Sequence, residues 1–176
     1  MKTLLKKKLS PNELRKRARS LKLVLTDSDG VLTDAGVYYS ESGEAFKRFS
    51  IRDGMGVERL RVAGVETAII TGEKSESVRR RAEKLQMPHV YLGVKNKRQE
   101  LERILQETGL TIPQIGYIGD DVNDLGIIDA IADRGLTAAP SDAMPVVLEN
   151  VHYHCILPGG HGAFRDFAEW ILRMRA

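Results

Sequence analysis

The 176-residue sequence has one cysteine, few aromatic side chains and no long apolar run. Because Cys155 stands alone, no disulfide can form within the chain, and we expect a reducing compartment. No apolar stretch reaches the ~20 residues that cross a bilayer. The first residues also lack the apolar core of a signal peptide. These absences predict a cytoplasmic protein that has no membrane partner.

Charge is distributed unevenly along the chain, whose net charge is +3 and whose sequence pI is about 9.0. Basic residues cluster in Lys6–Lys8 and Arg15–Arg17, and the remainder is slightly acidic. No aromatic residues alternate with these clusters as they do on many nucleic-acid-binding surfaces, so we expect no nucleic-acid partner. We predict a basic helical extension over residues 1–20 and a single globular domain over residues 21–176.

Strand and helix patterns alternate throughout the body of the chain. Short apolar runs predict strands at Leu21–Thr26, Val65–Ile70, His89–Leu92, Ile115–Ile118, Leu136–Ala138 and Val151–Ile156. The stretches between them have helical spacing, as in Lys74–Gln86 and Lys97–Thr108. This alternation favours an α/β fold with a doubly wound, mostly parallel, Rossmann-like sheet. The one insertion, a β-hairpin between Val37 and Phe49, is too small for a cap domain.

Polar residues gather directly after four of the predicted strands. They are Asp27 and Asp29, then Thr71 and Gly72, then Lys97, and finally Asp120, Asp121 and Asp124. Each motif alone is more typical of a turn or a helix start. Together they would share one crevice, because the carboxyl ends of parallel strands lie at one edge of the sheet. Carboxylates supply nucleophile, proton carrier and Mg²⁺ ligands, and lysine neutralises phosphoryl oxygens, so the set predicts Mg²⁺-dependent phosphoryl chemistry.

These ordered motifs resemble those of the haloacid dehalogenase superfamily of phosphohydrolases. Asp27–Asp34 is similar to its first motif, Thr71 to its second, Lys97 to its third and Gly119–Asp124 to its fourth. Ile51–Gly56 and Gly159–Arg165 narrow the resemblance to the capless 3-deoxy-D-manno-octulosonate 8-phosphate phosphatase group. The resemblance implies that residues 21–176 form a phosphatase domain.

The resemblance implies roles for three aspartates. Asp27 would attack phosphorus and form an aspartyl-phosphate. Asp29 would protonate the leaving sugar oxygen and then deprotonate the water that cleaves the intermediate. The Asp27 carboxylate, the Asp29 backbone carbonyl and Asp120 would hold Mg²⁺.

The resemblance also implies supporting residues and an assembly. Asp121 and Asp124 would orient metal-bound waters and Lys97. Thr71 and Gly72 would bind the phosphoryl group together with Lys97. The group is typically a homotetramer in which hairpins and C-terminal segments close the active sites of neighbouring subunits.

Four residues bear on the substrate, and they do not all favour the same sugar. Arg52 and Asp53 match residues found in the octulosonate enzymes. Arg165 lies in the C-terminal segment, which the resemblance implies is close to the substrate of a neighbouring subunit. Glu73 instead matches the residue found in the nonulosonate 9-phosphate phosphatases, whereas the octulosonate enzymes commonly carry Arg at this position. The implied substrate is 3-deoxy-D-manno-octulosonate 8-phosphate, in lipopolysaccharide biosynthesis. The alternative is a nonulosonate (KDN or sialic acid) 9-phosphate.

Two other classes of protein share part of this pattern. A receiver-type signalling domain is also doubly wound and uses Asp, Thr and Lys. Its paired acidic residues come early, however, whereas here Asp27 and Asp29 come first and the Asp120–Asp121 pair comes late. A non-catalytic module that has kept the fold is disfavoured, because the predicted reactive residues are all present.

Overall fold

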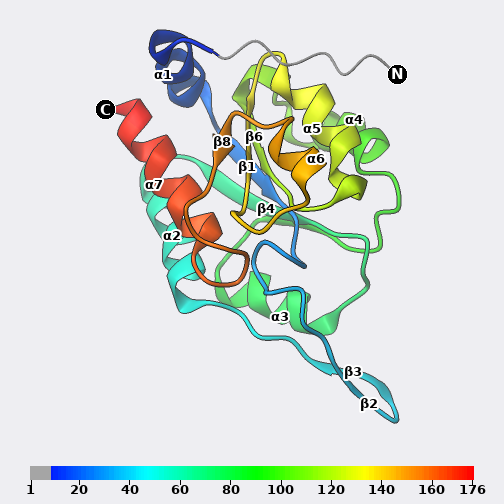
Figure 1. The fold of residues 1–176 in the computed structure, drawn as a ribbon. Coiled ribbons are helices and arrows are strands. Elements are labelled where there is room, and N and C mark those ends of the chain that lie inside the picture. The colour runs from blue at the N-terminus through cyan, green and yellow to red at the C-terminus, as the bar shows by residue number, and fades with distance from the viewer. Residues whose placement is uncertain (1–8) are drawn as a thin grey trace.

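A computed structural model describes residues 9–176, which form a six-stranded sheet between two layers of helices (Figure 1). The strands are β1 (Leu23–Thr26), β4 (Glu66–Ile70), β5 (His89–Tyr91), β6 (Ile115–Ile118), β7 (Leu136–Ala139) and β8 (Tyr153–His154). Their order is β5-β4-β1-β6-β7-β8, and every neighbouring pair is parallel. The direction of winding reverses between β1 and β6, where such sheets open a crevice at the carboxyl ends of the strands. The predicted doubly wound α/β fold is confirmed.

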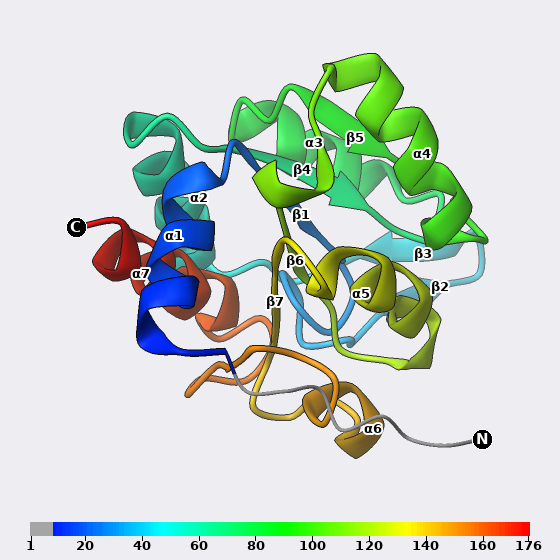
Figure 2. The ribbon, with the colours of Figure 1, turned by 90° about the horizontal axis from the view of Figure 1, so that it is seen from above.

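Two hydrophobic clusters cover the two faces of the sheet. One face carries α1 (Pro11–Ser20), α2 (Ile51–Val62), α3 (Glu76–Lys84) and α7 (Ala163–Arg175). The other carries α4 (Lys97–Thr108), α5 (Leu125–Ala132) and α6 (Pro145–Leu148), and two short 3-10 turns, η1 (Ile112–Gln114) and η2 (Val122–Asp124), precede β6 and α5. Figure 2 shows α1, α2 and α7 on one side of the sheet and α4 and α5 on the other. Within β1, Val24 faces the first cluster and Leu23 and Leu25 face the second, so the strand is buried on both faces.

The predicted hairpin extends away from the sheet (Figure 1). It consists of β2 (Tyr38–Ser40) and β3 (Gly43–Phe46), which pair antiparallel. Tyr38 stacks on Phe46 with ring centroids 4.7 Å apart, yet these side chains are 56% and 59% exposed. Tyr39 is 76% exposed. Among the described residues only this hairpin and α2 separate β1 from β4, so no cap domain is present.

The basic helix α1 is packed against the body of the molecule. Ser10 caps it by accepting a hydrogen bond from the Glu13 amide at 3.2 Å. Arg17 donates to the carbonyls of Ala132 and Asp133, at 2.8 and 2.7 Å, at the C-terminal end of α5. The Lys6–Lys8 cluster lies outside the described residues. From residue 9 onward, none of the helices has the length and apolar character needed to cross a membrane.

Candidate active site

The loop after β1 is shaped by tight backbone contacts. The Asp27 amide donates to the Ile118 carbonyl at 3.0 Å and so extends the β1–β6 pairing by one residue. Gly30 has φ +86°, and a Cβ there would overlap the Asp120 carboxylate. A Cβ on Gly159 would overlap the Gly30 carbonyl, and the amide of the next residue, Gly160, donates to the Val31 carbonyl at 2.9 Å. Glycine is therefore required where these backbones meet.

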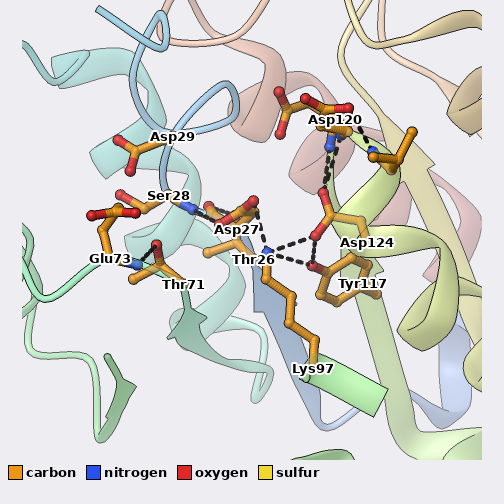
Figure 3. Close-up of polar contacts among 12 residues, drawn as sticks. Thr26, Asp27, Ser28, Asp29, Thr71, Glu73, Lys97, Tyr117, Asp120 and Asp124 are labelled. Atoms are coloured by element: carbon orange, nitrogen blue, oxygen red, sulfur yellow. Dashed lines mark hydrogen bonds and ion pairs between the residues drawn. The ribbon is translucent and has the colours of Figure 1, made fainter. Parts of the chain in front are cut away.

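Lys97 lies at the centre of a buried polar network (Figure 3). Its Nζ is 2.7 Å from Asp27 Oδ2 and 2.6 Å from Asp124 Oδ1, and the residue is only 3% exposed. Asp124 Oδ1 also accepts from the Tyr117 hydroxyl at 2.6 Å. Asp124 Oδ2 accepts from the amides of Asp120 and Asp121 at 2.8 and 3.3 Å. Both oxygens of Asp124 are thus engaged, and its role in this arrangement is to orient Lys97 and the loop after β6.

The charges in this network are unbalanced. Burial, and then the neighbouring Asp124, raise the pKa of Asp27 to about 7, although Lys97 opposes the shift. Burial, followed by Asp27 and Asp124, raises the pKa of Asp120 to about 8. Burial disfavours the charge of Lys97, but Asp27 and Asp124 outweigh it and raise the lysine pKa. One ammonium therefore faces three carboxylates, and the site lacks positive charge.

The unbalanced carboxylates fit a divalent cation. One oxygen each from Asp27, Asp120 and Asp124 lie within 4.8 Å of one another. Asp120 Oδ1 is buried and has no hydrogen-bond partner among the described residues, which is unusual for a buried polar oxygen. Each oxygen of Asp124 already accepts from two donors and Asp124 does not line the pocket, whereas Asp27 and Asp120 do, so these two are the carboxylates that can bind the ion. Hard oxygen donors of this kind suit Mg²⁺.

A pocket of about 360 Å³ opens above this cluster. It is lined by Asp27, Asp29, Ala35, Thr71, Gly72, Glu73, Asp120, Asp121, Val122 and Asn123. Thr71 is held in place by its amide, which donates to the Tyr91 carbonyl at 3.0 Å, while its hydroxyl accepts from the Glu73 amide at 3.2 Å. The structure therefore brings seven predicted residues to one crevice: Asp27, Asp29, Thr71, Gly72, Glu73, Asp120 and Asp121. Lys97 and Asp124 do not line it, and Lys97 connects to it by contacting Asp27.

Sequence reasoning missed one residue of the site, Lys47, which lies directly after β3. Its Nζ lies 2.7 Å from each carboxylate oxygen of Asp29. The lysine side chain is 1% exposed, so its charge depends on this partner. A lone lysine after a short strand carries no motif, and only its place in a hairpin directly after the first motif could have indicated it.

Three predicted substrate residues do not line the pocket. Asp53 is 2% exposed, and its Oδ1 accepts from the Arg165 amide at 3.0 Å, at the start of α7. Burial raises its pKa, opposed by hydrogen bonds from that amide and from its neighbours Gly162 and Phe164. In this chain the Asp53 carboxylate serves as the N-terminal cap that α7 otherwise lacks, and it does not line the pocket, so its predicted substrate contact stays a prediction.

Arg52 and Arg165 are also directed elsewhere in this chain. Arg52 is exposed in the first turn of α2. Arg165 Nε lies 2.7 Å from Glu169 Oε1, one turn further along α7. Neither side chain reaches the pocket of its own chain, so their predicted substrate roles depend on a neighbouring subunit.

Comparison with known proteins gives close relatives over nearly the whole chain, although no protein-family model matches it. The chain is 37% identical over 161 residues to the 3-deoxy-D-manno-octulosonate 8-phosphate phosphatase of Haemophilus influenzae, covering 91% of this chain and 87% of that protein. It is 35% identical over 156 residues to the Yersinia pestis enzyme of the same name, covering 89% and 82%.

Solved structures of related phosphatases have the same fold as this chain. The Moraxella catarrhalis phosphatase, in complex with a magnesium ion, a phosphate ion and KDO, superimposes with a TM-score of 0.85 at 33% identity, covering 93% of this chain and 92% of that one. A haloacid dehalogenase superfamily hydrolase from Legionella pneumophila gives 0.87 at 36% identity, covering 93% and 88%. The likeness includes both sequence and fold and spans most of each protein. The chain therefore belongs to the 3-deoxy-D-manno-octulosonate 8-phosphate phosphatase family of the haloacid dehalogenase superfamily.

Proposed function

We propose that this protein is a Mg²⁺-dependent phosphoric monoester hydrolase that converts 3-deoxy-D-manno-octulosonate (KDO) 8-phosphate to KDO and phosphate. The observation that carries the proposal is the buried Asp27, which faces the pocket beside Asp29 and Asp120 at the carboxyl edge of β1 and β6. The relatives named above support the substrate, and one of them was solved with magnesium, phosphate and KDO bound.

In the first step the Asp27 carboxylate attacks phosphorus, and the bond from phosphorus to the sugar oxygen breaks. Asp29 gives its proton to that oxygen, which leaves as the sugar hydroxyl. The Lys97 ammonium, 2.7 Å from Asp27, orients the nucleophile and offsets charge on the phosphoryl group. Thr71 and Gly72 also line the pocket, and their hydroxyl and backbone groups would bind phosphoryl oxygens.

In the second step a water molecule attacks the phosphoryl group on Asp27. Asp29, now ionised, takes the proton of that water, and the bond between phosphorus and the Asp27 oxygen breaks. Phosphate leaves, and Asp27 and Asp29 return to their starting states. The same carboxyl group thus serves as acid and then as base.

Asp27 and Asp120 would hold Mg²⁺, with the Asp29 backbone carbonyl as a further ligand. When bound, the ion offsets negative charge on the phosphoryl oxygens. Asp124 keeps Lys97 and the Asp120–Asp121 amides in place, and Asp121 lies at the rim where it can orient water.

A homotetramer is part of this proposal. The hairpin presents Tyr38, Tyr39 and Phe46 to solvent, and exposed apolar clusters of this kind are typical of interaction sites. Assembly through the hairpin would also give Arg52 and Arg165 a route to a neighbour's pocket. A cytoplasmic location and a place in lipopolysaccharide biosynthesis follow from the proposed substrate.

A phosphatase panel with Mg²⁺ tests the substrate. KDO 8-phosphate should give the highest kcat/KM, above nonulosonate 9-phosphates and small generic phosphates. A preference for a nonulosonate 9-phosphate would replace the substrate and keep the chemistry, with Glu73 as the residue to examine. A phospho-aspartate that persists without phosphate release would overturn the hydrolase and favour a receiver-type domain.

A further inference from the structure

Lys47 is a buried ammonium to which the two steps above give no part. Its Nζ donates to both carboxylate oxygens of Asp29 at 2.7 Å, and its side chain is 1% exposed. The Thr33 hydroxyl adds a donor to Asp29 Oδ1 at 3.3 Å. A buried charge is costly unless it is paired, so the place of Lys47 is coupled to that of Asp29.

The lysine is tied in turn to the hairpin and to α3. Glu44 Oε2, on β3, lies 3.6 Å from Lys47 Nζ. The Ser75 hydroxyl donates to Glu44 Oε1, and Ser75 also caps α3 by accepting from the Val78 amide at 3.4 Å. A continuous set of polar contacts therefore runs from α3 through Glu44 of β3 and Lys47 to Asp29.

The Asp29 side chain would be poorly fixed without these contacts. It is 24% exposed, and no dashed line joins it to the network around Asp27 and Lys97 in Figure 3. Two donors from one ammonium fix both the direction and the plane of a carboxylate. Proton transfer depends on such placement, because a misplacement of about 1 Å can cost ~10²-fold in rate.

We propose that Lys47 is a positioning residue that holds the Asp29 carboxylate for proton transfer, so that turnover requires a docked hairpin. The inference rests on the proposed function, in which Asp29 is the acid and base. Lys47 itself transfers no proton: the proton passes between Asp29 and the leaving oxygen or the attacking water. While Asp29 carries the proton, one of its oxygens holds it and the other accepts from the Lys47 ammonium; once ionised, Asp29 accepts through both oxygens. The hairpin thereby becomes part of the active site of its own chain.

A double-mutant cycle tests the proposal through kcat and KM, with p-nitrophenyl phosphate and KDO 8-phosphate as substrates. Lys47→Met should lower kcat about 10- to 100-fold, with KM changed by less than about 3-fold. Asp29→Asn should lower kcat about 10²- to 10⁴-fold. The double variant should be no slower than Asp29→Asn alone, because Lys47 acts through Asp29.

Two further variants separate positioning from folding. Arg80→Met removes an exposed cation of α3, which pairs with Glu76 at 3.1 Å and does not touch Asp29, so it should leave kcat unchanged. Lys47→Arg keeps a buried donor for the carboxylate and should retain more activity than Lys47→Met. Thermal unfolding of each variant shows whether it is folded.

Either of two results would overturn the proposal. One is a Lys47→Met enzyme with wild-type kcat. The other is a double variant slowed by the full product of the two single losses, which would mean that Lys47 acts independently of Asp29. If the wild type hydrolyses p-nitrophenyl phosphate and not KDO 8-phosphate, the substrate assignment fails while the cycle still tests Lys47.

Discussion

At the residue scale, Asp27 is the proposed nucleophile, and burial and the neighbouring Asp124 disfavour its negative charge. Asp27→Asn removes the nucleophile and should lower kcat by at least about 10³-fold. The fold should persist, because the amide relieves repulsion from Asp124 and Lys97 keeps its 2.6 Å partner Asp124. Phosphate release and the unfolding midpoint, measured on the same sample, check both expectations. Wild-type turnover by this variant would contradict the assignment of the nucleophile.

The site residues differ in how far sequence could reveal them. Asp27 and Asp29 follow β1 directly, and Asp120 follows β6, so the expected strand ends placed them together. Lys47 and Asp53 do not follow a strand of the parallel sheet, so the expected strand ends did not indicate their contacts. Their contacts, with Asp29 and with the Arg165 amide, join positions 18 and 112 residues apart, and only the folded chain brings these together.

At the element scale, α2 and α7 are joined by the Asp53 cap. Asp53→Ala should destabilise the protein by about 1 kcal/mol, since it removes the acceptor for the amides that begin α7. For a chain of this size the loss corresponds to a Tm lower by roughly 2–4 °C. Asp53→Asn is the matched control, because it keeps an acceptor oxygen and should lose less. An Ala variant that melts with the wild type would show that the cap contributes nothing.

The hairpin is the other element whose role can be separated from folding. Tyr39 is 76% exposed, so Tyr39→Glu should leave the described fold intact. In the proposed tetramer the new charge would be buried in an apolar contact and should cause dissociation. Light scattering after size exclusion measures the mass. The control is Gln106→Glu, which adds a charge on the exposed side of α4. Equal masses for the wild type and both variants would argue against assembly through Tyr39.

At the scale of the whole molecule, stability should depend jointly on pH and Mg²⁺. Asp27 and Asp120 have pKa values of about 7 and about 8, raised from 3.8. Without metal, the stabilisation linked to their protons is complete below pH 3.8 and is lost as pH rises through 7 to 8. A bound cation replaces those protons, so Mg²⁺ should bind more tightly as pH rises.

Thermal unfolding in EDTA and in Mg²⁺ measures this linkage. The increase in Tm caused by Mg²⁺ should be larger at about pH 8 than at about pH 5.5, where the proton competes for the carboxylates. Asp120→Asn, which removes one ligand, should shrink the difference. An equal Mg²⁺ effect at both pH values would contradict the carboxylate pair as the metal site.

The overall architecture could be predicted because its signals are local. Each strand of a parallel sheet is buried on both faces, so apolar runs such as Leu21–Thr26 stand out from the helices between them. The placement of α1 could not be predicted, since its basic sequence suggested a solvated extension. In the fold Arg17 instead contacts carbonyls 115 and 116 residues away.

The contact of Gly159 and Gly160 with the Gly30–Asp34 loop has a consequence for biosynthesis. The loop that carries the nucleophile leaves the ribosome well before the glycines that support it. Contacts so distant in sequence form late in folding. We therefore expect a nascent chain to build most of its sheet while still catalytically silent, and to become an enzyme only after the Gly159–Gly160 segment has emerged.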